Sequence, residues 1–155
     1  MKYSGLEVLY KSFPGIDTRN DPITEILSEE LNQGRVKLTD KHPTEIIPKI
    51  DIVLFDMIST GFAEAIQIGV PTLVYSNDFD YKLASNEGKI INDKLQECGV
   101  VFYDLEAGIR SFERIVTDLP SFRKAYSDPI HQFQEAVAYP VSKKEFLKSI
   151  DKKIE

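Results

Sequence analysis

The chain is poor in cysteine and histidine, which limits the kinds of structure it can form. Among 155 residues, Cys98 is the only cysteine, and histidine occurs twice. No disulfide can therefore form within the chain, and nothing in it requires an oxidising compartment. No spacing of His, Cys or Asp suggests a metal site, so we predict neither a metal nor a cofactor.

Long hydrophobic runs are also missing. The longest, such as Ile52–Phe55, falls far short of the roughly 20 residues that cross a bilayer. Charged residues Lys2, Glu7 and Lys11 interrupt the N-terminal region, which does not fit a secretory signal. We therefore expect a cytoplasmic protein without a transmembrane segment.

The chain also lacks an excess of positively charged residues. Lys and Arg number 19 against 25 Asp and Glu, which gives a net charge of −6 and a pI near 5.0. A nucleic-acid partner is excluded on this ground, because neutralising phosphates requires a basic surface stripe.

Hydrophobic residues are present in the usual amount. They make up 42% of the chain, and Phe and Tyr contribute 9 and 7 aromatic side chains. A chain of this length normally forms one compact domain that buries roughly 70% of the surface of the unfolded chain. We therefore predict a single domain over residues 1–155.

Short apolar runs alternate with helical patterns along most of the chain. The predicted strands are Leu6–Tyr10, Val36–Leu38, Ile52–Phe55, Thr72–Tyr75 and Val100–Tyr103. Each is too short for a helix and is rich in β-branched or aromatic residues, which favours buried strands.

The segments between these strands carry helix start and stop signals. The first helix should begin at Asp21-Pro22, an N-cap followed by a proline in the first turn. Its apolar residues Ile23, Ile26, Leu27 and Leu31 recur at helical spacing, and it should end at Gly34. A short helix is predicted over Thr44–Lys49, and Pro48 should strain its last turn. The next helix is predicted over Thr60–Ile68 and should end at Gly69. A fourth helix should run from Ser85 to Gly99, with an apolar side formed by Ile90, Ile91, Leu95 and Cys98.

The pattern changes after Tyr103. A helix is predicted over Ile109–Val116. Helical structure should be interrupted at Leu119-Pro120 and at Asp128-Pro129. A final helix is predicted over Lys143–Ile154, with Ser142 as its candidate cap. Alternating strands and helices indicate a parallel sheet covered on both faces. The predicted fold is an α/β, Rossmann-like, doubly wound domain with about five mainly parallel strands and extra C-terminal helices.

The segment Asp56–Gly61 is the main candidate site. It follows the third predicted strand and leads directly into a helix, and ligands of open α/β sheets bind where strands end and helices begin. Ser59 or Thr60 can cap this helix, and Gly61 allows close approach to the backbone. Free amides and the helix dipole suit a phosphate here, although simple capping and turning also explain these residues.

Glu64 extends this candidate site. It lies four residues after Thr60 and five after Ser59, so it is misplaced for a capping box, which needs a spacing of three. Its carboxylate either faces solvent, where it complements the helix dipole, or lies over the strand ends, where it could bind two ribose hydroxyls.

The ordered set of residues around this site resembles a known family. Ser59–Glu64, then Gly69-Val70-Pro71 and the strand Thr72–Tyr75, is similar to the donor-binding C-terminal domain of GT-B glycosyltransferases, in which Gly and Pro also follow the Glu by five and seven positions. Asp56-Met57-Ile58-Ser59 is similar to the Asp-x-x-Ser turn of the CDP-glycerol glycerophosphotransferases and related surface-polysaccharide enzymes. The resemblance covers roughly residues 5 to 117.

The resemblance implies a nucleotide-diphosphate-sugar or CDP-alditol donor. It assigns the diphosphate to Ser59, Thr60 and Gly61, and the ribose to Glu64. Lys11, just after the first strand, is where the polysaccharide enzymes have a basic residue, and it could also face the diphosphate. Phe13 stands where those enzymes have a histidine.

Sugar contacts are expected from the loop after Tyr75. Asp78 and Asp80 lie there, where related transferases often have Gln, Asn or Asp, although surface loops are polar in any case.

A complete GT-B enzyme has two Rossmann-like domains, and this chain corresponds to one. We therefore expect an excised or split half that works with an N-terminal acceptor-binding domain or a partner chain. The catalytic base is expected on that missing half, so this chain alone should be nearly inactive. The full enzyme could associate peripherally with a membrane.

Two alternatives remain open. UDP-sugar 2-epimerases share the spacing from Glu to Gly-x-Pro, but they have Asp-Ser-Gly-Gly before it, which differs from Asp56–Gly61. A non-catalytic α/β module could also use the same turn to bind a regulatory nucleotide or another protein.

Overall fold

The computed structural model describes residues 5–12, 21–76, 82 and 84–137. The chain divides into two compact units, unit 1 over residues 1–42 and unit 2 over residues 43–155. Each unit has its own parallel sheet, and each is described separately below.

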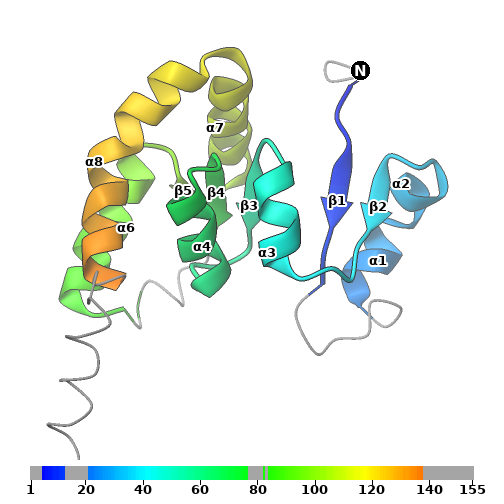
Figure 1. Cartoon of the computed structure of the whole chain (residues 1–155), viewed down its shortest axis with the longest axis horizontal. Helices are drawn as coiled ribbons and strands as arrows, with labels where there is room; N and C mark the ends of the chain where they lie inside the picture. The colour runs from blue at the N-terminus through cyan, green and yellow to red at the C-terminus, as the bar shows by residue number, and fades with distance from the viewer. Residues whose placement is uncertain (1–4, 13–20, 77–81, 83, 138–155) are drawn as a thin grey trace, which may run out of the picture. The chain divides into compact units, whose positions relative to one another are not determined.

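Unit 1 has the order β1 (Val8–Tyr10), α1 (Pro22–Ile26), α2 (Ser28–Asn32) and β2 (Val36–Leu38). The two strands are parallel, with Val8 opposite Val36 and Tyr10 opposite Leu38 (Figure 1). The expected first helix is thus two short helices that meet at Leu27.

The predicted cap at Asp21 is confirmed. Its carboxylate accepts the backbone N–H of Ile23 at 2.9 Å and the hydroxyl of Tyr10 at 2.6 Å. One buried carboxylate therefore satisfies a free amide at the start of α1 and ties that helix to the end of β1.

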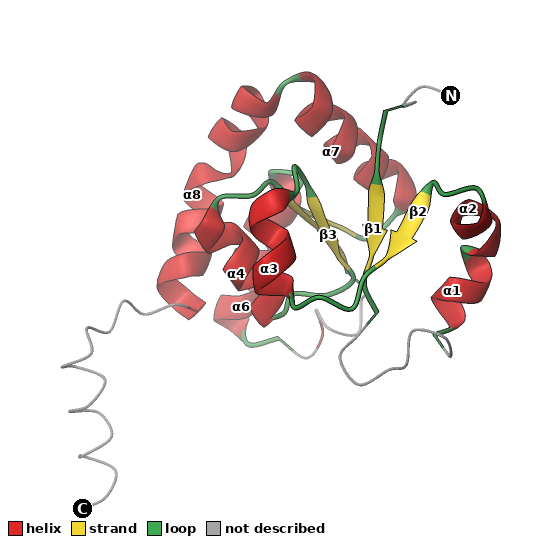
Figure 2. Cartoon of the chain, turned by 45° about the vertical axis from the view of Figure 1, so that its right-hand side comes forward, coloured by secondary structure: helices red, strands yellow, loops and turns green. Residues whose placement is uncertain are grey.

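Unit 2 has strands and helices in alternation. Their order is α3 (Pro43–Ile46), the 3₁₀ turn η2 (Ile47–Lys49), β3 (Val53–Phe55), α4 (Thr60–Ile68), β4 (Thr72–Tyr75), α6 (Asn86–Glu97), β5 (Val101–Phe102), α7 (Leu105–Thr117) and α8 (Leu119–Val137). The strands are parallel in the order β3-β4-β5, with Phe55 opposite Val74 and Tyr75 opposite Phe102. Figure 2 shows β3 with α3 and α4 beside it.

The predicted α/β class and the parallel strands are confirmed, but the single sheet of about five strands is wrong. The described strands form one sheet of two and another of three. Apolar runs of this length identify strands, but they do not say which strands pair, because pairing depends on contacts distant in sequence.

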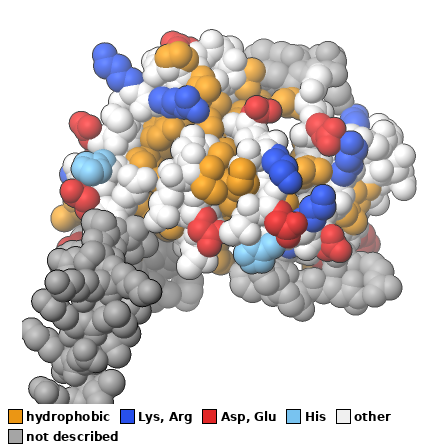
Figure 3. Space-filling model, viewed as in Figure 1, with side chains coloured by type: hydrophobic (Ala, Val, Ile, Leu, Met, Phe, Trp, Pro, Cys, Tyr) orange, Lys and Arg blue, Asp and Glu red, His pale blue; other side chains and the backbone are white. Residues whose placement is uncertain are grey.

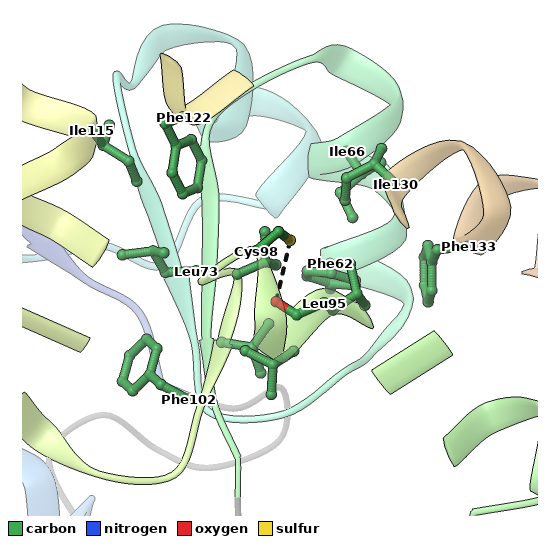
Figure 4. Packing of buried hydrophobic residues seen from close by; sticks show 13 residues of the cluster. Phe62, Ile66, Leu73, Leu95, Cys98, Phe102, Ile115, Phe122, Ile130 and Phe133 are labelled. Atoms are coloured by element: carbon green, nitrogen blue, oxygen red, sulfur yellow. Dashed lines mark hydrogen bonds between the residues drawn. The ribbon is translucent and has the colours of Figure 1, made fainter. Parts of the chain in front are cut away.

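The core of unit 2 lies between its sheet and its helices (Figure 4). Phe62 on α4 is fully buried. Its ring packs edge to face against Phe133 of α8, with centroids 5.0 Å apart, and also meets Phe55 of β3 at 6.3 Å. Burying a side chain of this kind stabilises the fold by roughly 1.5–3 kcal/mol, so α4 is held firmly where it follows β3.

The predicted limits of the middle helices are largely confirmed. α4 covers Thr60–Ile68 and ends at Gly69, whose φ of 83° is in the left-handed region. Ser85 caps α6 by accepting the N–H of Gly88 at 3.1 Å. One detail is wrong, because Ile90 is 56% exposed and does not lie on the apolar side of α6.

Prolines interrupt the helices less than expected. Pro48 turns the end of the predicted Thr44–Lys49 helix into the 3₁₀ turn η2. α8, however, runs through both Pro120 and Pro129. Pro120 lies in the first turn, where no N–H bond is needed, whereas Pro129 removes the bond to the carbonyl of Ala125 inside the helix.

The predicted helix over Lys143–Ile154 lies outside the described residues. Over the part of the chain that is described, no helix is long and apolar enough to span a membrane.

Candidate functional site

The candidate site lies at one edge of the three-stranded sheet of unit 2. Its strands are parallel, so their carboxyl ends share this edge. Asp56, Met57 and Ile58 follow β3 there and are exposed, and Tyr75 at the end of β4 is 48% exposed. The edge thus presents the Asp56 carboxylate and several apolar side chains to a ligand.

The start of α4 is the polar centre of this edge. Ser59 is the N-cap residue, with extended backbone at φ −133° and ψ 178°, but its side chain makes no capping hydrogen bond. By contrast, Ser85 caps α6, and Asp104 caps α7 by accepting the N–H of Ala107 at 2.8 Å. Among residues 5–12, 21–76, 82 and 84–137, the first-turn amides of α4 therefore have no side-chain cap, and no acidic residue lies in that turn to offset the positive end of the helix dipole.

Gly61 lies against the ring of Phe55. A Cβ atom at position 61 would be 3.0 Å from Cε1 of Phe55 and 3.7 Å from Oγ of Ser59. The close approach expected at this glycine is therefore made by a core aromatic ring, and packing alone explains the residue. A diphosphate contact of Gly61 stays a prediction.

Glu64 is half-buried on the second turn of α4. Helical side chains lean toward the helix N-terminus, which directs its carboxylate toward the turn that contains Thr60. Thr60 is itself exposed. Among the described residues, the Glu64 side chain takes part in neither of the two interactions that usually fix a carboxylate, an ion pair and a hydrogen bond. It remains able to accept hydrogen bonds from a ligand.

The other predicted contacts stay predictions. Lys11 directly follows β1, as expected, but it belongs to unit 1. Asp78 and Asp80 lie outside the described residues. The site that the structure describes thus consists of Ser59, Thr60, Gly61 and Glu64, all on α4 or next to it.

Tyr75 was not among the site residues predicted from the sequence. It ends β4 at the same edge as Ser59, and its ring lies 5.7 Å from that of Phe102. A strand-terminal aromatic residue does signal a surface of this kind, but strand propensity explains it equally well.

Cys98 behaves as the packing residue that the sequence suggested. It is buried, and its thiol donates a hydrogen bond to the carbonyl of Leu95 at 3.3 Å. Burial raises the pKa of the thiol, and this outweighs the opposite influence of the nearby Arg114 guanidinium. A neutral thiol is a poor nucleophile. Within the described residues, no group of three or more His, Cys, Asp and Glu side chains is arranged to hold a metal ion.

Comparison with known proteins adds no relative. No protein-family model matches the sequence, and neither a curated protein nor a solved structure matches it significantly.

Proposed function

We propose that unit 2 binds the nucleotide-diphosphate part of an activated sugar or alditol, as the donor half of a GT-B-type glycosyltransferase of surface-polysaccharide synthesis. The observation that carries the proposal is the uncapped start of α4 at the carboxyl edge of the sheet, with the half-buried Glu64 one turn further along. The order of residues from Ser59 to Pro71 supports it, because the same order marks the donor site in that family.

Each residue has a chemical task in this proposal. The N–H groups of the first turn of α4 and the hydroxyls of Ser59 and Thr60 donate hydrogen bonds to the diphosphate, and the helix dipole favours its negative charge. Glu64 accepts hydrogen bonds from the ribose hydroxyls. This electrostatic stabilisation of the leaving diphosphate takes the place of a bound metal ion.

The acceptor and its catalytic base belong to a second domain or partner chain in this proposal. Unit 2 therefore supplies donor affinity and leaving-group stabilisation, and the isolated chain transfers little or no sugar. The identity of the donor nucleotide would also narrow down the class of transferase to which unit 2 and its partner belong.

Isothermal titration calorimetry of the full chain with UDP, CDP and GDP tests the proposal. We expect one nucleoside diphosphate to bind better than the other two, and Glu64→Gln to weaken that binding at least tenfold, because a carboxylate accepts stronger hydrogen bonds than an amide. Glu87→Gln is the matched control, since Glu87 lies in the first turn of α6 and not of α4.

Two results would contradict the proposal. One is the absence of binding by all three nucleotides, which would favour a protein-interaction module. The other is an equal effect of Glu64→Gln and Glu87→Gln on nucleotide affinity, which would place the nucleotide elsewhere.

A further inference from the structure

A depression on the other helices of unit 2 is independent of the start of α4. It has a volume of about 250 Å³ and lies between α6, α7 and α8, with the lining residues Lys94, Glu97, Cys98, Arg114, Ala125 and Pro129. Figure 1 shows that α8 runs alongside α6 after leaving the end of α7. These residues lie 34 to 69 positions beyond Thr60, the first residue of α4, and no prediction from sequence grouped them.

A proline interrupts the hydrogen bonding of α8 at the depression. Pro129 has no N–H, so the carbonyl of Ala125, four residues earlier, lacks its helical donor. Ala125 and Pro129 both line the depression. The break in the hydrogen-bond ladder of α8 therefore coincides with the gap between this helix and its neighbours.

Within the part of the chain that the structure describes, two cations line the depression without a carboxylate partner. Lys94 donates to the side-chain oxygen of Gln132 at 2.6 Å, and Arg114 donates to the backbone carbonyl of Ser121 at 3.2 Å. Among the described residues, the ion pairs of unit 2 involve other cations, and Glu97 is the one acid in the lining. The hydrogen bonds to neutral groups hold both cations in place but leave their charges unneutralised.

We propose that this depression is a binding site for a small phosphate-bearing anion, held by Lys94 and Arg114. Half-buried cations bind phosphate more strongly than fully hydrated ones, because charge-assisted hydrogen bonds gain strength as water is excluded. Arg114 offers its guanidinium as a fork of donors, and Lys94 adds a compact charge from the neighbouring helix. The volume admits an anion of the size of phosphate or a small phosphate ester.

Inorganic phosphate is the probe for the test, titrated into the full chain at low ionic strength with chloride as the reference anion. Lys94→Gln and Arg114→Gln should each weaken phosphate binding about tenfold. Lys89→Gln on α6 and Arg110→Gln on α7 remove the same charge from the same helices outside the lining, and they should leave the affinity unchanged. Circular dichroism of each variant verifies that the fold is retained.

Cys98 provides a second, independent measurement. It lines the depression and is the only cysteine of the chain, so its reaction with a small thiol reagent, although slow because the thiol is buried and protonated, reports on this place alone. Phosphate should slow the labelling of Cys98 several-fold in the natural chain and have no effect in Arg114→Gln.

Either of two results would overturn the proposal. One is phosphate binding that is equal in the natural chain and in Lys94→Gln or Arg114→Gln, as expected if phosphate binds only at the start of α4. The other is a rate of Cys98 labelling that does not respond to phosphate. Because the nucleotide test depends on Glu64 and this test does not, failure of one leaves the other intact.

Discussion

Gly108 on α7 lies directly against the ring of Phe102 at the end of β5. A Cβ atom at position 108 would approach Cδ2 of Phe102 to 2.8 Å, and the ring itself is buried. The absence of a side chain on Gly108 thus sets how closely α7 packs on the sheet.

Gly108→Ala should therefore destabilise unit 2. A glycine inside a helix normally gains up to about 1 kcal/mol on replacement by alanine, but the forced shift of Phe102 should outweigh this gain and lower the free energy of unfolding by roughly 1–3 kcal/mol. Denaturant unfolding followed by circular dichroism measures the change. Gly88→Ala on α6 is the control, because its added Cβ would make only 3.4 Å contacts, and it should be neutral or stabilising.

Gly69 and Gly99 form a matched pair. Both have a left-handed backbone, with φ of 83° and 85°, but a Cβ on Gly69 would meet nothing within 4 Å, whereas one on Gly99 would lie 2.8 Å from Oγ of Ser111. Gly69→Ala should cost about 1–2 kcal/mol from backbone strain alone. Gly99→Ala should cost more, and the difference should largely disappear in a Ser111→Ala background. Equal losses in the two single variants would show that the Ser111 contact is unimportant.

Asp21 joins α1 to β1 in unit 1. Asp21→Ala removes the cap of α1 and leaves the hydroxyl of Tyr10 without this acceptor, so we expect a loss of about 1–2 kcal/mol. Tyr10→Phe removes only the second interaction and should have a smaller effect. Amide hydrogen exchange in residues 22–32 locates the change, which should be absent from α4 and α6.

Cys98 predicts a loss of stability at alkaline pH. Its pKa in the native chain is raised above the ordinary thiol value of 9.0 by burial. Below that value the thiol is protonated in both states and contributes no pH dependence. Above it the unfolded chain releases the proton first and so binds fewer protons than the native chain, which lowers the free energy of unfolding as pH rises.

Cys98→Ala isolates this effect. The difference in unfolding free energy between the natural chain and the variant should be constant below pH 8 and should shrink above pH 9, measured by denaturant unfolding in steps of pH. The pKa of Tyr126 is also raised, mainly by burial and to a smaller extent by Cys98, so both proteins are compared in a Tyr126→Phe background. A difference that stays constant to high pH would contradict a buried, protonated thiol.

Local sequence patterns did not predict which apolar side chains of α7 are exposed. Apolar side chains reach the surface in Figure 3. On α7, Leu105 is 72% exposed and Ile109 is 47% exposed. The buried side of this helix instead carries Gly108, Ser111 and Ile115. The position of Leu105 and Ile109 at the surface follows from the close packing of α7 on Phe102, which requires a glycine at position 108.

The sequence by itself determined the local elements of this protein. Asp21 and Ser85 start helices, Gly69 and Gly99 end them, and the apolar runs form parallel strands, because caps, left-handed glycines and strand propensity act within a few residues. Tertiary structure alone decided that the strands form two sheets, that α8 continues through Pro129, and that Lys94 and Arg114 line one depression. These features depend on packing between segments that are distant in sequence. The free energy of this packing overrides local preferences, and it produces no short-range sequence pattern from which the features could be predicted.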